Sequence, residues 1–115
     1  MEPAKKSPLA SRHKAYARLR AQLAGIGWLS EGYVQNRRAS GGSPSYAWTR
    51  KVKGKTVCVA LSKEQYEWFK QAIVNWRTVQ NILRQMQRLS RKELFQSLPG
   101  PSRRKKLSKS VLGLV

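Results

Sequence analysis

Acidic side chains are scarce in this chain: its 115 residues include no aspartate and only five glutamates. Nucleases and transposases that use two metal ions need several neighbouring carboxylates to hold those ions beside the scissile phosphate. Glu2 lies in a basic terminal segment, and three further glutamates lie where a helix is predicted, so solvent-facing or capping roles explain them: Glu64, Glu67 and Glu93. The composition therefore argues against a metal-dependent nuclease.

Cysteine, histidine and phosphate-binding glycines are also limited. Cys58 is the single cysteine and His13 the single histidine, which excludes an intramolecular disulfide and gives no basis for a paired-histidine metal site or a Cys–His nucleophile. Because Cys58 falls in an alternating strand pattern, we expect a half-buried small hydrophobic residue. Gly41 and Gly42 lack the Lys-Ser/Thr pair or helix start of a phosphate loop. We expect no catalytic activity, no cofactor and no metal.

Long apolar runs are missing as well. The N-terminal sequence MEPAKKSPLASRHK has no apolar signal core, and no stretch approaches the roughly 18 apolar residues that cross a bilayer. We therefore expect a cytoplasmic protein and no membrane partner.

Basic residues, by contrast, are abundant along the whole chain. Its 24 lysines and arginines give a formal net charge of +19. Such a charge destabilises an isolated compact state by self-repulsion and attracts polyanions, which release counterions when phosphates are neutralised. We expect the polyanion to be nucleic acid; an anionic membrane surface is the alternative that attracts the same charge.

Two β-rich segments joined by Lys53-Gly54 form the clearest structural pattern. Residues 46–52 and 55–61 are rich in aromatic and β-branched side chains, and a two-residue connection predicts a tight hairpin. The register places the large apolar side chains on one face. The predicted cross-strand pairs are Val52–Lys55, Arg50–Val57, Trp48–Val59 and Tyr46–Leu61. The other face should show Ala47, Thr49, Lys51, Thr56, Cys58 and Ala60. A further short strand is expected over residues 32–38, followed by a loop over residues 39–44.

Helical periodicity flanks this hairpin on both sides. Over residues 9–24, helical spacing places one set of apolar residues on one side, with Gly25 ending the helix. These residues are Tyr16, Leu19, Leu23 and Ile26. Ser62 and Gln65 form a capping box from which a second helix can run to about Ser97, before Pro99. Ser90 and Glu93 repeat the capping pattern, so a break near residue 90 is an open alternative to one continuous helix.

The second helix carries one main apolar stripe. Its members are Phe69, Ala72, Ile73, Trp76, Val79, Leu83, Met86 and Leu89, with Trp68, Ile82 and Leu94 at or beyond the margins. Together the patterns predict an α+β fold: a basic N-terminal helix, a small antiparallel sheet centred on the hairpin of residues 46–61, and a long helix over about 63–97 that pairs antiparallel with the first. We expect a basic disordered arm over residues 1–8, a single domain over 9–98, and a basic tail over 99–115 whose apolar end docks onto something.

Three groups of basic residues are candidates for contacting nucleic acid. The first surrounds the hairpin tip, which can enter a groove or lie against phosphates. The second, Arg37 and Arg38, leads into a loop that we expect to face this tip, and the third is the basic run after the long helix. With arginines of the first helix, the set is Arg12, Arg18, Arg20, Arg37, Arg38, Arg50, Lys51, Lys53, Lys55, Arg103, Arg104, Lys105 and Lys106. The alternative interpretations are a solvated tip that blocks edge pairing and a solubilising tail.

Aromatic side chains can stack on unpaired bases. The aromatic candidates are Trp28, Tyr33, Tyr46, Trp48, Trp68 and Trp76. In a domain this small most of them are needed for the core, so we expect most to be buried. Trp68, which lies off the main helical stripe, is the candidate for base stacking.

Four short motifs follow one another along the chain: Gly27-Trp28, Gly32-Tyr33-Val34 leading to Arg37, the hairpin sequence YAWTRKVKGKTV, and LSKEQ before the long helix. Over residues 10–91 they resemble an uncharacterised family of small bacterial domains often encoded near transposase genes. The resemblance implies a mobile-element or genome-defence setting and no particular reaction. Many members look as if they hold a cysteine cluster between the first two strands; residues 38–45 here contain no cysteine, which excludes a zinc knuckle.

These observations predict a non-catalytic nucleic-acid-binding accessory subunit of a mobile-element complex, either transposon or RNA-guided. DNA and structured RNA are both open, and a larger protein such as a transposase or RNA-guided effector is the expected protein partner, with self-association through the long helix as a further option. The alternatives are a structural RNA-binding protein of ribosomal type and an interaction or inhibitor module that binds an acidic protein surface.

Overall fold

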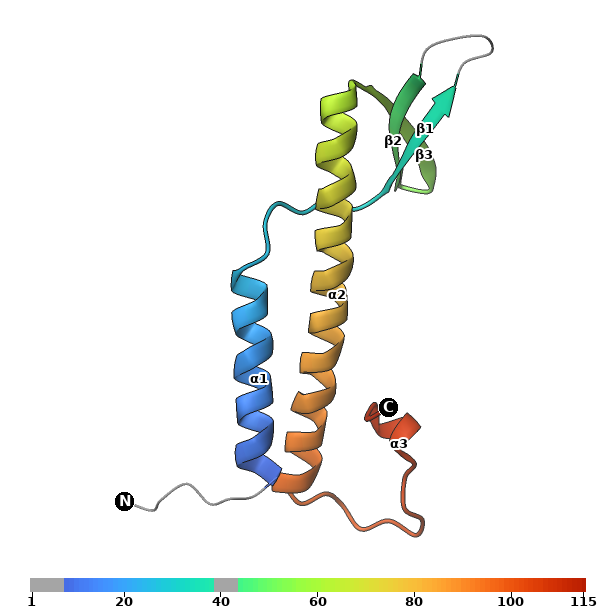
Figure 1. Cartoon of the computed structure of the whole chain (residues 1–115). Coiled ribbons are helices and arrows are strands. Elements are labelled where there is room, and N and C mark those ends of the chain that lie inside the picture. The colour runs from blue at the N-terminus through green and yellow to red at the C-terminus, as the bar shows by residue number, and fades with distance from the viewer. Residues whose placement is uncertain (1–7, 39–43) are drawn as a thin grey trace. The chain divides into compact units, whose positions relative to one another are not determined.

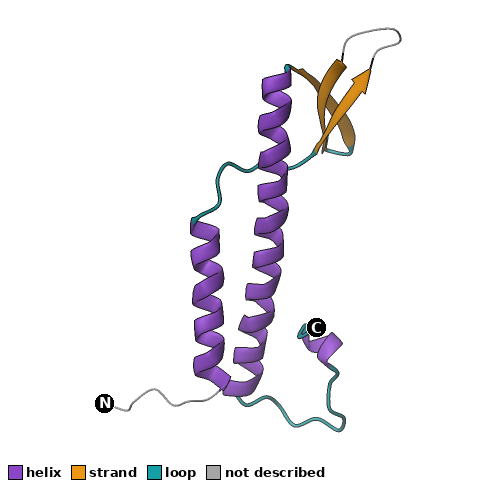
Figure 2. Cartoon of the chain, viewed as in Figure 1, coloured by secondary structure: helices purple, strands orange, loops and turns teal. Residues whose placement is uncertain are grey.

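The structure, a computed structural model, describes residues 8–38 and 44–115. Its elements follow the order α1 (Pro8–Ala24), β1 (Tyr33–Arg38), β2 (Pro44–Val52), β3 (Lys55–Leu61), α2 (Lys63–Ser97) and α3 (Lys109–Leu112) (Figure 1, Figure 2). The predicted α+β fold is confirmed. Apart from Pro8 and Pro44, the expected N-terminal arm and the predicted loop over 39–44 lie outside the described residues.

Two compact units make up the chain, and α2 runs through both. One unit holds α1 and the chain from Gln80 onward, and the other holds Ile26–Val79. The single domain expected over residues 9–98 stays a prediction.

The sheet has three antiparallel strands in the order β1-β2-β3. The four cross-strand pairs predicted for the hairpin are all present. Lys53 and Gly54 have φ values of 49° and 81°. Positive φ at both central residues defines the type I′ turn that suits a two-residue hairpin. The predicted register and turn are therefore confirmed.

One face of this sheet, the inner face, packs against α2 through aromatic rings. The Tyr46 ring lies 4.8 Å from that of Tyr66, and Trp48 stacks on Phe69 at 4.7 Å with an interplanar angle of 19°. The indole Nε1 of Trp48 also donates a hydrogen bond of 3.0 Å to the backbone oxygen of Glu31. Tyr46 and Trp48, both half-buried, thus pack on α2 from the face that their alternation predicts.

The segment that leads into β1 is tied to α2 by two hydrogen bonds. The Asn75 side chain donates to the backbone oxygen of Trp28 at 2.9 Å. The backbone N–H of Ser30 donates to the backbone oxygen of Ala72 at 3.2 Å. These contacts hold β1 beside the hairpin without requiring the Trp28 side chain, which is 76% exposed.

The long helix α2 starts and continues as a single element. The Ser62 N–H donates to Oε1 of Gln65 at 2.9 Å, and the Gln65 N–H donates to Oγ of Ser62 at 3.1 Å, so the predicted capping box is confirmed. Ser90 does not start a new helix, because its hydroxyl donates to the backbone oxygen of Met86 at 2.9 Å within α2. The alternative of a break near residue 90 is wrong.

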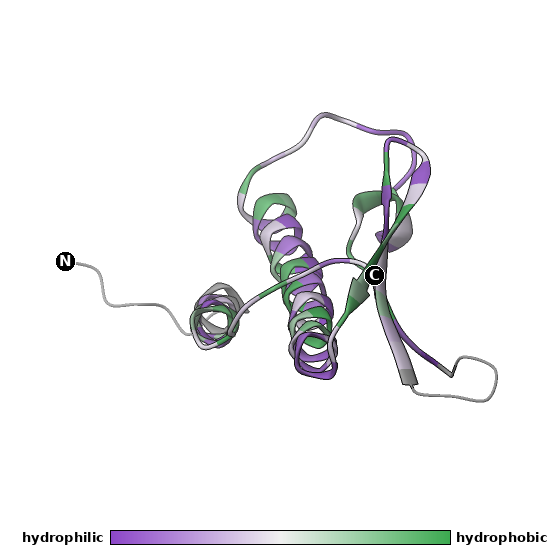
Figure 3. Cartoon of the chain, turned by 90° about the horizontal axis from the view of Figure 1, so that it is seen from above, coloured by the Kyte–Doolittle hydropathy of each residue, from purple (hydrophilic) through white to green (hydrophobic). Residues whose placement is uncertain are grey.

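The apolar stripe of α2 differs from the prediction at one turn. Ile82 is 3% exposed and belongs to the core, whereas Leu83 is 39% exposed. Coloured by hydropathy, α2 carries both hydrophobic and hydrophilic residues along its length (Figure 3). Its first half packs on the sheet and its second half lies beside α1. Helical spacing after Val79 allows either Ile82 or Leu83 to face inward, and Ile82 is the one that is buried.

In the unit that contains both chain ends, α1 lies antiparallel beside the second half of α2 (Figure 1, Figure 3). Leu19 is buried, and Tyr16 and Leu23 are half-buried, so the predicted apolar side of α1 is confirmed. His13 Nε2 lies 3.9 Å from a carboxylate oxygen of Glu93. The expected pairing of the two helices is therefore also confirmed.

The chain end contains a short helix that the sequence analysis did not predict. Ser108 caps α3 by accepting a hydrogen bond from the Val111 N–H at 3.2 Å, and Gly113 ends it with a left-handed φ of 73°. Nη1 of Arg91, on α2, donates to the Gly113 oxygen at 3.2 Å. The last residues thus dock onto α2.

No helix among the described residues has the length and apolar character needed to span a bilayer.

Candidate nucleic-acid interface

The hairpin tip gathers exposed lysines around a tight turn. Lys51, Lys53 and Lys55 are all exposed. Space around Gly54 is open, since a Cβ built on it would meet no atom within 4 Å. The three strands contain five lysines and arginines and no acidic residue, so no carboxylate on them neutralises this charge. The tip is therefore a cationic projection with room for a phosphate backbone.

Arg50 lies on the inner face, as the register predicts. Its guanidinium carbon is 5.0 Å from the centre of the Trp48 ring. Its Nε is buried and has no hydrogen-bond partner among the described residues. A guanidinium over an indole face is favourable, so Arg50 contributes to packing beneath the tip.

Arg37 and Arg38 lie at the other end of the sheet from the hairpin tip. In the antiparallel pairing, Arg37 faces Ser45 and Arg38 faces Pro44. Ser45 precedes Lys51 by six residues on β2, or about 20 Å at roughly 3.3 Å per residue. The expectation that this arginine pair faces the tip is wrong, because β1 runs away from the tip toward the loop that connects it to β2.

The other face of the sheet, the outer face, is open. By strand alternation and pairing it consists of Tyr33, Gln35, Arg37, Ser45, Ala47, Thr49, Lys51, Thr56, Cys58 and Ala60. Ala47 is buried among its neighbours and Thr49 is half-buried, but the others are exposed. Cys58 is exposed too, so the expectation that it is half-buried is wrong: no element covers this face among the described residues.

Arg37 is oriented on this face by a neighbour. Its Nε donates to Oε1 of Gln35 at 2.6 Å. The two side chains lie on the same face because they are two residues apart on β1. This contact uses Nε and leaves both Nη groups of Arg37 for a ligand.

The remaining basic candidates belong to the other unit. Arg12, Arg18 and Arg20 lie on α1, and the last two are exposed. The basic run after α2 is exposed as well; it comprises Arg103, Arg104, Lys105 and Lys106. The structure therefore divides the sequence-predicted residues into two sets, one on the sheet and one around α1 and the chain end.

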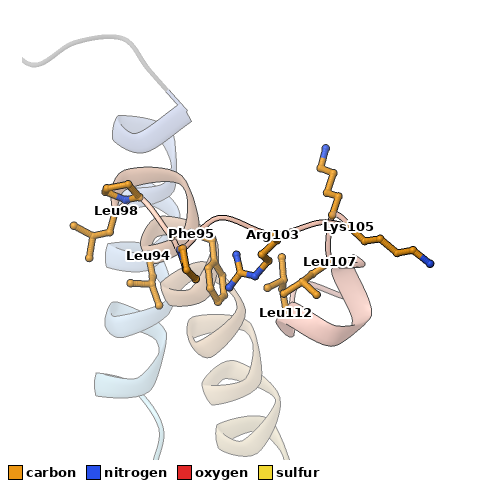
Figure 4. A pocket seen from close by; sticks show the side chains of 11 residues that line it. Leu94, Phe95, Leu98, Arg103, Lys105, Leu107 and Leu112 are labelled. Atoms are coloured by element: carbon orange, nitrogen blue, oxygen red, sulfur yellow. The ribbon is translucent and has the colours of Figure 1, made fainter.

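A cavity of about 580 Å³ lies beneath the basic run. It is lined by apolar residues of the end of α2 and of the chain end, with cationic residues at its rim. The apolar lining includes Leu94, Phe95, Leu98, Leu107 and Leu112. Phe95, Arg103, Leu107 and Leu112 point toward one another, while Lys105 extends away (Figure 4). Arg103 thus lies among the apolar residues of the cavity, whereas Lys105 faces solvent.

More of the aromatic side chains are exposed than the sequence analysis predicted: Trp28, Tyr33 and Trp68 all are. Trp68 is 47% exposed and meets Phe69 edge-on at 5.3 Å, so it remains accessible to a base. Tyr33 is 67% exposed, more than Trp68. Its position opposite Thr49, on the outer face, is a signal that strand alternation could have supplied.

Among the residues described, no three His, Cys, Asp or Glu side chains are placed to hold a metal ion. Compared with family models, curated proteins and solved structures, the chain matches none of them. The resemblance to the transposase-associated family therefore stays a prediction.

Proposed function

We propose that this protein is a non-catalytic nucleic-acid-binding accessory subunit of a mobile-element nucleoprotein complex in the bacterial cytoplasm. The observation that carries the proposal is the hairpin tip, where exposed Lys51, Lys53 and Lys55 surround an open turn on a sheet that has no acidic residue. Phosphates are the ligand that such a surface attracts most strongly.

The whole-chain charge supports the same proposal. A protein that neutralises several phosphates releases their condensed counterions, so its affinity falls steeply as salt rises. At +19 on 115 residues, self-repulsion weakens the free folded state, and a polyanion relieves that repulsion. Binding should therefore stabilise the fold as well as recruit the protein.

Exposed apolar residues near the end of α2 support a protein partner. Leu94, Phe95 and Leu98 are 45%, 42% and 61% exposed. Apolar patches that stay open on a highly charged protein mark contacts with other proteins. A larger protein of the same complex, such as a transposase or an RNA-guided effector, is the partner that we propose.

A salt titration with matched charge variants tests the hairpin assignment. The test variant replaces Lys51, Lys53 and Lys55 by alanine. The control replaces three exposed arginines of α2 by alanine, which removes the same charge and suits a helix; these are Arg77, Arg84 and Arg88. Binding to a labelled duplex is measured by fluorescence anisotropy between about 50 and 200 mM salt.

The two variants have different expected outcomes. The lysine variant should bind more weakly, and the slope of log K against log salt should flatten by about 3, since each lost phosphate contact removes about one ion. The arginine variant should change less. Equal effects would mean that the net charge alone attracts the polymer, and binding unchanged by the lysine substitutions would overturn the hairpin assignment.

A further inference from the structure

The outer face of the sheet has no role in the packing described above, and its composition is unusual. We propose that this face lies in the major groove of duplex DNA. The inference rests on the proposed function, because it names the polymer and the surface that contacts it.

The shape of the outer face suits a groove. Neighbouring strands are about 4.8 Å apart, and the major groove of B-form DNA, about 12 Å wide, admits a two-stranded ribbon. Two adjacent strands of this sheet therefore fit inside the groove, and the third lies at its rim. The two middle rows of the face are Tyr33, Thr49 and Cys58, and Gln35, Ala47 and Ala60. The two alanines keep the second of these rows low and allow base edges to approach the backbone there, with Tyr33 at one side of the face.

The polar side chains on this face can read bases. Arginine donates two hydrogen bonds to guanine, and glutamine pairs with adenine, in the major groove. The hydrogen bond of 2.6 Å from Arg37 Nε to Gln35 orients the guanidinium before DNA arrives. Arg37 and Gln35 are thus a preorganised pair of base-reading groups, and Lys51 is a third cationic group on the same face.

Charge at both ends of the face complements a duplex. Lys51 lies on the outer face near one end and Arg37 near the other. Their separation of about 20 Å corresponds to roughly six base pairs, at about 3.4 Å each. The strands between them contain no carboxylate that would repel a phosphate.

Single strands and RNA duplexes fit this face less well. Tyr33 is the single aromatic residue on the outer face, whereas sheets that bind single strands stack two or three bases on aromatic rings. The major groove of A-form RNA is too deep and narrow for side chains to read. The observations therefore favour duplex DNA.

Cys58 provides a direct test, because the only thiol of the chain is exposed on the outer face. The alkylation rate of Cys58 is measured in the full chain with and without duplex DNA. At a DNA concentration about ten times the Kd, alkylation should slow about tenfold. The matched control is Cys58→Ser/Val59→Cys, because Val59 is the next residue on β3, lies on the inner face and is 41% exposed. DNA should leave alkylation at position 59 nearly unchanged.

Other outcomes of this experiment overturn the inference in distinguishable ways. If DNA binds near 0.1 M salt without slowing Cys58 alkylation, the proposed function stands and the groove assignment fails. Equal protection of Cys58 by an RNA duplex of the same sequence contradicts the choice of DNA. Protection that rises with protein concentration alone assigns the face to a second copy of the chain. If neither polymer binds, the proposed function fails as well.

A variant test addresses the base-reading pair. Arg37→Ala should lower affinity for a preferred duplex about fivefold to a hundredfold and relax the sequence preference. Lys53→Ala, at the tip, should weaken all duplexes to a similar extent. If Arg37→Ala also weakens all sequences equally, Arg37 contacts phosphate and the base-reading assignment is wrong.

Discussion

Gly32, immediately before β1, is the position where one added methyl group should do the most damage to the sheet. Its φ is +105°. A Cβ there would lie 2.5 Å from Nε1 of Trp48 and 2.6 Å from the backbone oxygen of Thr49. The Thr49 oxygen belongs to β2 and cannot move freely, so Trp48 must shift away from Phe69 and from its hydrogen bond to Glu31.

The expected cost of Gly32→Ala follows from these contacts. Positive φ costs a side-chain-bearing residue about 1–3 kcal/mol. Loss of the Trp48 hydrogen bond adds about 0.5–1.5 kcal/mol, and loss of the aromatic stacking a similar amount. The free energy of unfolding should therefore fall by about 2–6 kcal/mol. For a domain this small, that is a large fraction of the total stability.

Gly54→Ala is the matched control, because Gly54 also has a positive φ, of +81°, but its Cβ would meet nothing within 4 Å. It should cost only about 1–2 kcal/mol. Urea unfolding followed by circular dichroism at 222 nm measures both, with an m-value of about 1–3 kcal/mol/M. Equal shifts of the midpoint in the two variants would refute the packing role of Gly32 beneath Trp48.

Three further predictions concern the helices. Ser62→Ala removes one half of the capping box and should destabilise the protein by about 1 kcal/mol in the same urea assay; no change would mean that the cap adds nothing. Ile73→Ala and Ile82→Ala, at sites 5% and 3% exposed in different units, should each cost about 2–5 kcal/mol and lower one shared transition. Gly113→Ala, whose Cβ would lie 2.8 Å from Cδ of Arg91, should release the chain end and increase hydrogen exchange at α3.

The isoleucine prediction and the Gly113→Ala prediction can each be contradicted by one result. Separate transitions for Ile73→Ala and Ile82→Ala would mean that the two units unfold independently and that residues 9–98 are not one cooperative domain. Unchanged exchange in Gly113→Ala would mean that the Arg91 contact does not hold the chain end. The hydrogen exchange of β2 and β3 is an internal control in that experiment, since they belong to the other unit.

The hairpin was predictable in detail because local chemistry and pairing agree there. A Lys-Gly turn fixes a two-residue loop, and only one register then puts Tyr46 and Trp48 on the same face as Val59 and Leu61. The start of α2 was predictable for a similar reason, because Ser62 and Gln65 satisfy each other without help from distant residues.

Features set by tertiary contacts were not predictable in this way. Ser90 has the sequence of a cap, but its hydroxyl bonds within a helix that packing continues past it. Ile82 rather than Leu83 lies in the core, and helical spacing after Val79 does not decide between these two neighbours. The sequence also could not show that Arg37 lies far from the hairpin tip, since that depends on the direction of β1.

The candidate site was predictable in its residue types but not in its arrangement. Basic composition predicts a polyanion partner, and alternation assigns Lys51 and Cys58 to the same face. That no element among the described residues covers this face is a property of the tertiary structure, since α2 packs on the inner face. The exposure of Cys58 shows most clearly that the outer face is accessible.

The central claim, that this protein works on nucleic acid within a larger assembly, is tested most directly by isolating it from the cells that naturally make it. The purification is done at low salt without nuclease. The ratio of absorbance at 260 and 280 nm is then measured, and the copurified nucleic acid and proteins are sequenced. The account predicts a high ratio, a defined nucleic acid and a transposase or RNA-guided effector. A protein free of nucleic acid, and unable to bind it at about 0.1 M salt, would contradict the account and assign the charge to an acidic protein partner.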